Sequence, residues 1–291
     1  MDFKIVLQAI ANGIMIGGIY SLIGMSLTII FGVMKIINFC QGEMLMLGMY
    51  VTYVLNTSLG LDPFVAIPLV AIIMFLFGVV LNFLVINRSI QSDGNDSNML
   101  FLTAGLGILF SSGMQMIFGT NYRNATSIFA DQTISFLGVQ LSTNKAISFL
   151  ILLVLTALLY LFLMKTTTGK QIRATSQNRI GASVCGIKAK FIYNCTYGLG
   201  TAIAGVAGAC LMTYYYVFPI VGTTYGTRSF IVVTIGTLGN IVGGFFGGMV
   251  LGLLETLGAL IVGSEYKETL VYVCFVLILV IKQRIQAKRR A

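Results

Sequence analysis

Two acidic residues, Glu43 and Glu255, lie within long apolar stretches of the sequence and are the side chains most able to do chemistry there. A charged side chain in the hydrocarbon of a membrane costs a few kcal/mol, so it normally faces a cavity, a partner or a transport path. Both residues are therefore candidates for lining a translocation pathway.

Glu43 ends the run INFCQGE at residues 37–43, which contains two further polar side chains, Asn38 and Gln41. Gly42 permits a local break in a helix, and such a break frees backbone groups to line a cavity. Two interpretations follow from this pattern. Either Asn38, Gln41, Gly42 and Glu43 line or gate a pathway, or Glu43 is a hydrated acid near the membrane surface.

Glu255 is expected to lie deeper in its apolar stretch, in the run GLLETLG at residues 252–258. A lone carboxylate in that position must be hydrogen-bonded within the protein or protonated. It either lines the pathway or joins helices together. The side chains that we expect as its partners are Thr256, Thr234, Thr237 and Asn240.

Catalytic, metal and cofactor sites are not expected. The chain has no histidine, its five cysteines are scattered without a CxxC pair, and no G-x-x-x-x-G-K-[ST] phosphate loop is present. Nucleophilic catalysis by serine or cysteine would need a general base. The chain is therefore not expected to be an enzyme or to hydrolyse nucleotide, and energy for active transport must come from a partner or an ion gradient.

The composition indicates a membrane protein. Hydrophobic residues make up 57% of the 291, charged residues only 9%, and the mean hydropathy is +0.94. We expect an all-α, polytopic helical bundle forming one transmembrane domain over residues 1–291. The first apolar stretch has no leader with a cleavage pattern before it and is expected to stay as a membrane helix.

About eight or nine transmembrane or part-spanning helices are expected, because about 20 apolar residues cross a bilayer as a helix. One of them, 229–238, is short and interrupted by glycines, which is typical of a half-helix or a broken span. The expected stretches are 5–34, 36–56, 64–87, 98–119, 146–164, 191–218, 229–238, 243–262 and 268–282.

The charge pattern predicts the orientation. With nine crossings, thirteen of the eighteen Lys and Arg residues fall on the side of the C-terminus, which the positive-inside rule places in the cytoplasm. The N-terminus is then outside. The five basic residues left outside are Lys4, Arg123, Lys145, Arg228 and Lys267.

Two loops stand out in this topology. Segment 165–190 has six Lys and Arg residues and no acid, so it is expected to face a cytoplasmic partner. The external loop 120–144 is expected to contain a short surface helix or a hairpin, serving either as a docking surface or as a connector.

Three motifs resemble the permeases of bacterial branched-chain amino acid ABC transporters, the LivH-type permease subunit family. INFCQGE followed by MLGMY at 46–50 is similar to the family's I-N-F-A-x-G-E element, although Gln41 stands where many members have histidine. Segment 169–187 resembles G-x-x-x-R-A-x-x-x-N/D-x-x-x-A-x-x-x-G-I, and 236–247 resembles a glycine-rich G-x-x-G-x-x-x-G pattern. The similarity covers nearly the whole chain.

The resemblance implies a permease subunit of an ATP-driven importer in the bacterial cytoplasmic (inner) membrane. The expected substrate is a branched-chain amino acid, and the alternative is urea, a short amide or another small polar solute. Implied partners are a second, homologous permease subunit, two cytoplasmic ATP-binding subunits, an extracytoplasmic substrate-binding protein and membrane lipid, with no nucleic acid. ATP is then used by the partner subunits only.

The same resemblance implies that residues 173–186 form a cytoplasmic coupling helix, ending at Gly186. The residues assigned to coupling are Arg173, Ala174, Gln177, Asn178, Arg179, Ala182, Gly186 and Ile187. Three alternatives remain open: a merely solvated basic loop, a gradient-driven carrier acting alone, and an intramembrane enzyme. A carrier would be expected to show an inverted repeat with paired intramembrane acids.

Overall fold

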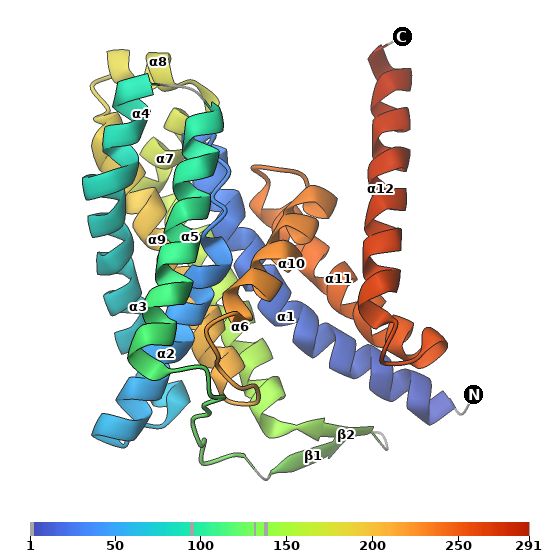
Figure 1. Ribbon diagram of the computed structural model, residues 1–291. Coiled ribbons are helices and arrows are strands. Elements are labelled where there is room, and N and C mark those ends of the chain that lie inside the picture. Colours follow the sequence, from blue (N-terminus) through green and yellow to red (C-terminus); the bar gives the residue numbers. More distant parts are fainter. Residues whose placement is uncertain (1–2, 94–95, 131, 137–138, 291) are drawn as a thin grey trace.

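The computed structural model describes residues 3–93, 96–130, 132–136 and 139–290 (Figure 1). The elements are α1 (Phe3–Met34), α2 (Gln41–Leu59), α3 (Pro63–Leu81), the π-helix η1 (Asn82–Ile86), α4 (Asn87–Asp93), α5 (Asp96–Phe118), β1 (Thr133–Phe136), β2 (Val139–Ser142), α6 (Thr143–Lys165), α7 (Thr167–Gln177), α8 (Arg179–Val184), α9 (Ala189–Met212), α10 (Val221–Gly236), α11 (Ile241–Val262) and α12 (Lys267–Arg290).

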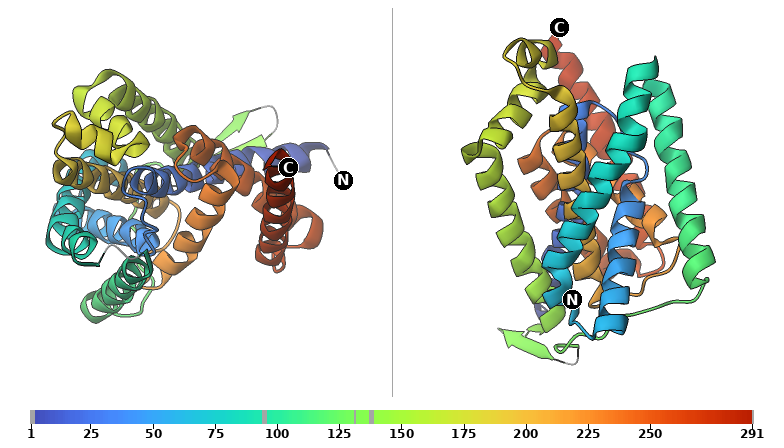
Figure 2. Two further views of the ribbon diagram at one scale, coloured as in Figure 1. Left: turned by 90° about the horizontal axis from the view of Figure 1, so that it is seen from above. Right: turned by 90° about the vertical axis from the view of Figure 1, so that its left-hand side faces the viewer.

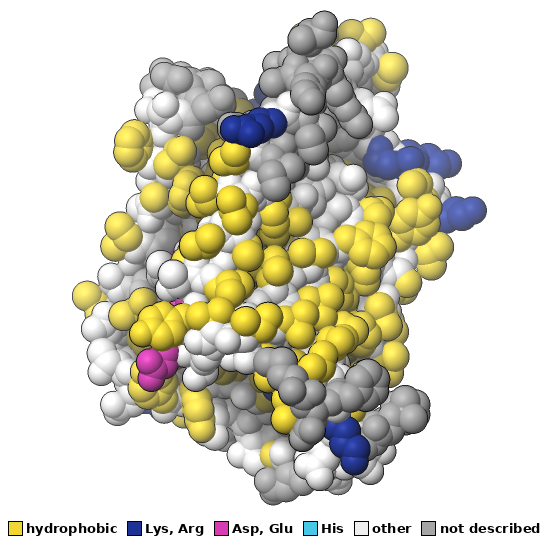
Figure 3. All heavy atoms as spheres, turned by 90° about the vertical axis from the view of Figure 1, so that its right-hand side faces the viewer, with side chains coloured by type: hydrophobic (Ala, Val, Ile, Leu, Met, Phe, Trp, Pro, Cys, Tyr) yellow, Lys and Arg dark blue, Asp and Glu magenta, His cyan; other side chains and the backbone are white. Residues whose placement is uncertain are grey.

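The expected all-α membrane bundle is confirmed. Six helical stretches of the described chain are long and apolar enough to cross a bilayer: α1, α3 with its continuation to Ile90, α5, α6, α9 and α11. Large exposed apolar side chains form a broad belt on the face shown in Figure 3, with Lys and Arg above and below it. Such a belt is what lipid solvates.

The two ends of the molecule carry different elements. In Figure 1, α7, α8 and the C-terminus lie at one end, while the N-terminus and the β-hairpin lie at the other. The second panel of Figure 2 shows the same separation from another side. The side chains of residues 281–283 and 285–290, which include most of the basic tail, lie outside the described part.

Helix α1 runs through the centre of the molecule, where it packs against α6, α9, α10 and α11. Glycines make the contact with α11 close: a Cβ on Gly17 would be 3.0 Å from the carbonyl oxygen of Gly248. On the other side, α9 packs closely on α2, where a Cβ on Gly48 would be 2.5 Å from Gly205 Cα. These glycines therefore serve close helix packing, as small residues do in membranes.

Four expected boundaries are corrected by the structure. Residues 36–40 are not helical, so the second helix begins at Gln41. The helix expected to end at 218 ends at Met212, because the following segment forms turns and a backbone bridge between Val217 and Arg123.

The short span expected over 229–238 begins earlier, at Val221, and ends earlier, at Gly236. Its 16 residues reach only about 24 Å at 1.5 Å per residue, which is less than the roughly 30 Å hydrocarbon core. Helix α10 alone is therefore too short to span the membrane.

The external loop 120–144 contains the hairpin that was one of the two expected forms. Strands β1 and β2 pair antiparallel, with Thr133 opposite Ser142 and Phe136 opposite Val139. Residues 131, 137 and 138 of this loop lie outside the described part.

Candidate functional site

The basic segment 165–190 forms α7 and α8, at the same end as the C-terminus (Figure 1). The single helix expected over 173–186 is wrong, because Asn178 divides it. The backbone of Asn178 is extended (φ −149°, ψ 103°), and its Oδ1 accepts a hydrogen bond from Gly181 N at 2.9 Å. Asparagine caps helices better than it continues them, so α7 ends and α8 begins at this residue.

The predicted end at Gly186 is confirmed. Its φ of 80° lies in the left-handed region that favours glycine. Next to it, Ile187 N donates a hydrogen bond to the carbonyl oxygen of Ala182 at 3.1 Å, and the Ile187 side chain packs against the core. The chain therefore turns back into the bundle at the point that the sequence predicted.

The residues assigned to coupling fall on two faces. Arg173, Gln177, Asn178 and Arg179 are exposed, whereas Ala182 is buried and Ala174 is half-buried. Ile172 and Thr175 are also buried, which fixes α7 against the membrane helices. The exposed set is thus held on a firmly packed support.

Arg179 is placed by an aromatic ring. Its guanidinium carbon lies 5.2 Å from the centre of the Tyr193 ring on α9, a cation–π geometry. The side chain remains exposed beside Gln177 and Asn178. Arg179 is the first residue of α8, and its positive charge is held in place by Tyr193 of α9.

Two apolar residues of α8 were missed by the sequence analysis. Ile180 and Val184 are 77% and 83% exposed and are four positions apart in the sequence, so they lie on one helix face. An i, i+4 apolar pair inside an otherwise polar segment was the available signal. Together with Arg179, the pair makes an exposed surface with both apolar and cationic character, which we call the α8 tip.

Asn38 and Gln41 form a fully buried hydrogen-bond network. Asn38 Nδ2 donates to Gln41 Oε1 at 2.9 Å and to the Tyr197 hydroxyl at 3.2 Å, while Gln41 Nε2 donates to Ser26 Oγ at 2.8 Å. The network joins the non-helical segment 36–40 to α1 and α9. In this conformation the side-chain amides of Asn38 and Gln41 find hydrogen-bond partners in each other and in neighbouring hydroxyl groups.

Gly42 does not break a helix, contrary to the expectation. It lies in the first turn of α2, where an added Cβ would collide with the carbonyl oxygen of Gly222 and lie 2.5 Å from Gly226 N. The missing side chain lets α2 and α10 approach closely. The irregular backbone comes instead from residues 36–40, before Gly42.

Glu43 lies beside the middle of α5. Its Oε2 is 3.5 Å from where a Cβ on Gly107 would be, and Gly107 is residue 12 of the 23 in α5. Only 7% of Glu43 is exposed. The carboxylate is therefore deeper in the bundle than a hydrated acid at the membrane surface would be.

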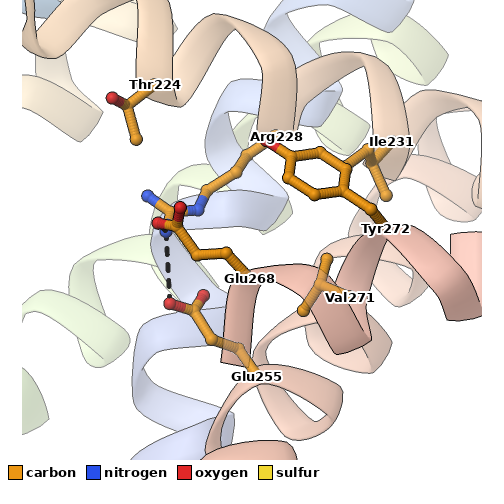
Figure 4. A pocket seen from close by; sticks show the side chains of 7 residues that line it. All are labelled: Thr224, Arg228, Ile231, Glu255, Glu268, Val271 and Tyr272. Carbon is orange, nitrogen blue, oxygen red and sulfur yellow. Dashed lines mark hydrogen bonds and ion pairs between the residues drawn. The ribbon is translucent and has the colours of Figure 1, made fainter. Parts of the chain in front are cut away.

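Glu255 belongs to a charged cluster on α1, α10, α11 and α12. Arg228 Nη2 lies 3.2 Å from Glu255 Oε1 and 3.1 Å from Glu268 Oε1, and Figure 4 shows its side chain reaching these two acids. The Tyr20 hydroxyl donates to Glu255 Oε2 at 2.5 Å, and Lys267 Nζ lies 3.5 Å from Glu255 Oε1. None of these partners was predicted.

Two sequence expectations about this cluster are thus corrected. Arg228 was counted in an external loop, but it lies in α10, with a side chain only 14% exposed. The expected partner Thr256 donates instead to the carbonyl oxygen of Gly252 at 3.0 Å. Glu255 joins four helices, which favours the structural role over the pathway role.

The structure does not bring all the candidates together. Asn38, Gln41 and Glu43 surround the start of α2, Glu255 lies in the cluster with the first residues of α12, and the α8 tip is at the C-terminal end of the molecule. Among the described residues, no three His, Cys, Asp or Glu side chains are grouped as metal ligands. The candidates therefore form three separate groups in the described structure.

Comparison with known proteins gives a consistent family. The family described as "Branched-chain amino acid transport system / permease component" matches residues 9–279. The high-affinity branched-chain amino acid transport system permease protein BraD of Pseudomonas aeruginosa is 25% identical and covers 95% of this chain and 94% of its own.

Two further relatives are similar over most of their length. The high-affinity branched-chain amino acid transport system permease protein LivH of Escherichia coli is 26% identical, over 96% of this chain and 94% of that protein. A probable branched-chain amino acid transport permease protein LivH of Methanocaldococcus jannaschii is 26% identical, over 87% and 83%.

Proposed function

The chain belongs to the family of branched-chain amino acid transport system permease components, and we propose that it forms the translocation pathway of an ATP-driven importer in the bacterial cytoplasmic membrane. The proposed substrate class is branched-chain amino acids, because the relatives are permeases of branched-chain amino acid transport systems rather than of urea or short amides. The family is one of transport permeases rather than enzymes.

The observation that carries the proposal is the exposed α8 tip on a rigid support. Helix α7 packs against α1, α6 and α9, so a force on α7 and α8 reaches three membrane helices at once. A merely solvated loop would not need a buried face, yet Ile172, Thr175 and Ala182 are buried. This supports movement of the bundle by a cytoplasmic partner.

The surface of the α8 tip fits the chemistry of a protein cleft. Arg179 supplies a cation, and Ile180 and Val184 supply apolar area. Next to the α8 tip, the exposed Gln177 and Asn178 add hydrogen-bonding groups. Buried apolar contacts give affinity, and complementary charge gives orientation. We assign this surface to one of two cytoplasmic ATP-binding subunits, each of which would bind one permease.

A second permease subunit, homologous but different, is proposed to complete the pathway. Helix α5 exposes Phe101, Ile108 and Met116 by 74%, 70% and 88%, and it makes few contacts with the rest of the chain. Glu43 lies next to this helix. We therefore propose that the pathway runs along α5, with Glu43 at mid-depth, and that an extracytoplasmic binding protein delivers the substrate at the hairpin end.

Co-purification of the intact chain with its ATP-binding subunit tests the proposal. We expect the unmodified chain to recover that subunit from detergent extracts, and Arg179→Glu combined with Val184→Glu to lose it. Arg88→Glu is the matched control, since Arg88 is an exposed cation on α4 outside segment 165–190. Equal recovery by the double variant would contradict docking at the α8 tip.

A further inference from the structure

A lateral cavity of about 300 Å³ lies between α1, α6, α7 and the turn that joins α10 to α11. Apolar side chains from α1, α6, α7 and the start of α11 form most of its wall, among them Ile29, Leu163, Ile172 and Val242. The cavity is separate from the network at Asn38, from Glu43 and from the Glu255 cluster. None of the transport roles proposed above uses it.

The mouth of the cavity faces the surface that lipid covers. Three residues that line it, Tyr160, Met164 and Val242, are 54%, 38% and 55% exposed. The helices on either side continue this surface, with Leu158 on α6 and Phe246 on α11 about equally exposed, at 60% and 61%. A hydrocarbon chain from the bilayer is the solute that such an apolar, laterally open cavity takes up.

One end of the cavity carries a cation. Arg173 of α7 lines it together with the polar residues Ser176 and Asn240, and Arg173 has no ion-pair partner among the described residues. Arginine binds phosphate through two parallel hydrogen bonds. The cavity thus combines an apolar wall with an arginine that can bind phosphate. A phospholipid has the matching parts, an acyl chain joined to a phosphate headgroup.

We propose that this cavity binds an anionic phospholipid of the cytoplasmic leaflet, with one acyl chain between α1, α6 and α11 and its phosphate on Arg173. The site connects α7 with the start of α11, so the bound lipid braces the coupling segment against the membrane helices. Arg173 then serves the lipid, while Gln177, Asn178 and Arg179 serve the ATP-binding subunit. This lipid site rests on the proposed orientation, in which α7 lies at the cytoplasmic side of the membrane. It does not depend on the proposed substrate or on the partner subunits.

Lipid retention on the purified chain tests the site without any ATP-binding subunit. The protein is delipidated in detergent and given phosphatidylglycerol or phosphatidylcholine with identical acyl chains, and bound lipids are counted by native mass spectrometry. We expect preferential retention of phosphatidylglycerol, reduced about fivefold by Arg173→Gln. Lys170→Gln, which removes another exposed cation of α7 outside the cavity, should retain phosphatidylglycerol normally.

Two further arms test the acyl part. Val242→Trp fills the exposed mouth and should reduce retention of both lipids, and soluble glycerol phosphate should not displace phosphatidylglycerol. Equal phosphatidylglycerol retention by the unmodified chain and Arg173→Gln would overturn the headgroup assignment. Unchanged retention by Val242→Trp, or displacement by glycerol phosphate, would overturn the acyl-chain site.

Discussion

The carboxylate of Glu43 and the backbone of Gly107 lie side by side, with Glu43 Oε2 3.5 Å from the position of a Cβ on Gly107. The absence of a side chain on α5 leaves room beside an acid at mid-depth. An intramembrane acid in such a place is a candidate for contact with the transported solute.

Gly107→Leu should strongly reduce uptake, because a leucine side chain would occupy the space next to the Glu43 carboxylate. Gly113→Leu is the matched control on the same helix, since a Cβ there meets no atom within 4 Å. Uptake of radiolabelled leucine by cells with equal amounts of each variant in the membrane is the measurement. Equal uptake by both variants would place the pathway elsewhere.

Glu43→Gln should change the rate of uptake while the chain still assembles with its partners. Glutamine has nearly the same size but no charge, so packing beside α5 is kept and only electrostatics change. Uptake and co-purification are measured on the same membranes. Normal uptake by this variant would remove the Glu43 charge from the pathway.

Asn178→Ala should weaken coupling, because it removes the cap that starts α8. Loss of such a cap costs about 1 kcal/mol, a large amount for a helix of six residues. We expect less ATP-binding subunit to co-purify and less ATP hydrolysis to be stimulated by substrate. Asn178→Ser keeps a capping oxygen and should restore most of the co-purification and most of the stimulated ATP hydrolysis. If it restores neither, the Asn178 side chain does not act as a helix cap.

Glu255→Gln should lower the thermal midpoint of the protein in detergent. The change leaves Arg228 with Glu268 alone, and we expect a loss of about 2 kcal/mol, between the values for exposed and for buried ion pairs. Glu265→Gln is the control, because Glu265 is exposed and has no ion pair among the described residues. Equal midpoints for the two variants would mean that the cluster adds no stability.

The helices could largely be predicted because lipid imposes a simple rule: a crossing helix needs a long apolar run. The ends were less predictable where tertiary contacts decide them. Helix α9 stops at Met212 because Val217 pairs with Arg123 far away in sequence. The hydropathy of the sequence gives no information about that backbone pairing.

In the candidate site, too, local features could be predicted from the sequence, and contacts between distant segments could not. Motif spacing predicted that segment 165–190 would have a helix ending at Gly186, and the left-handed backbone of Gly186 is a local property that a glycine reveals. The same motif predicted one continuous helix through Asn178. An asparagine at such a position can equally end one helix and cap the N-terminus of the next. The partners of Glu255 could not be found locally, because Tyr20, Arg228 and Lys267 come from three other helices.

Leucine uptake into proteoliposomes tests the central claim most directly, with the chain, its permease partner, the ATP-binding subunits and the binding protein reconstituted together. We predict uptake with ATP, none with a non-hydrolysable analogue, and none when the chain carries Arg179→Glu and Val184→Glu. Uptake that persists without ATP hydrolysis, or that an ion gradient alone sustains, would contradict an ATP-driven permease that is coupled through the α8 tip.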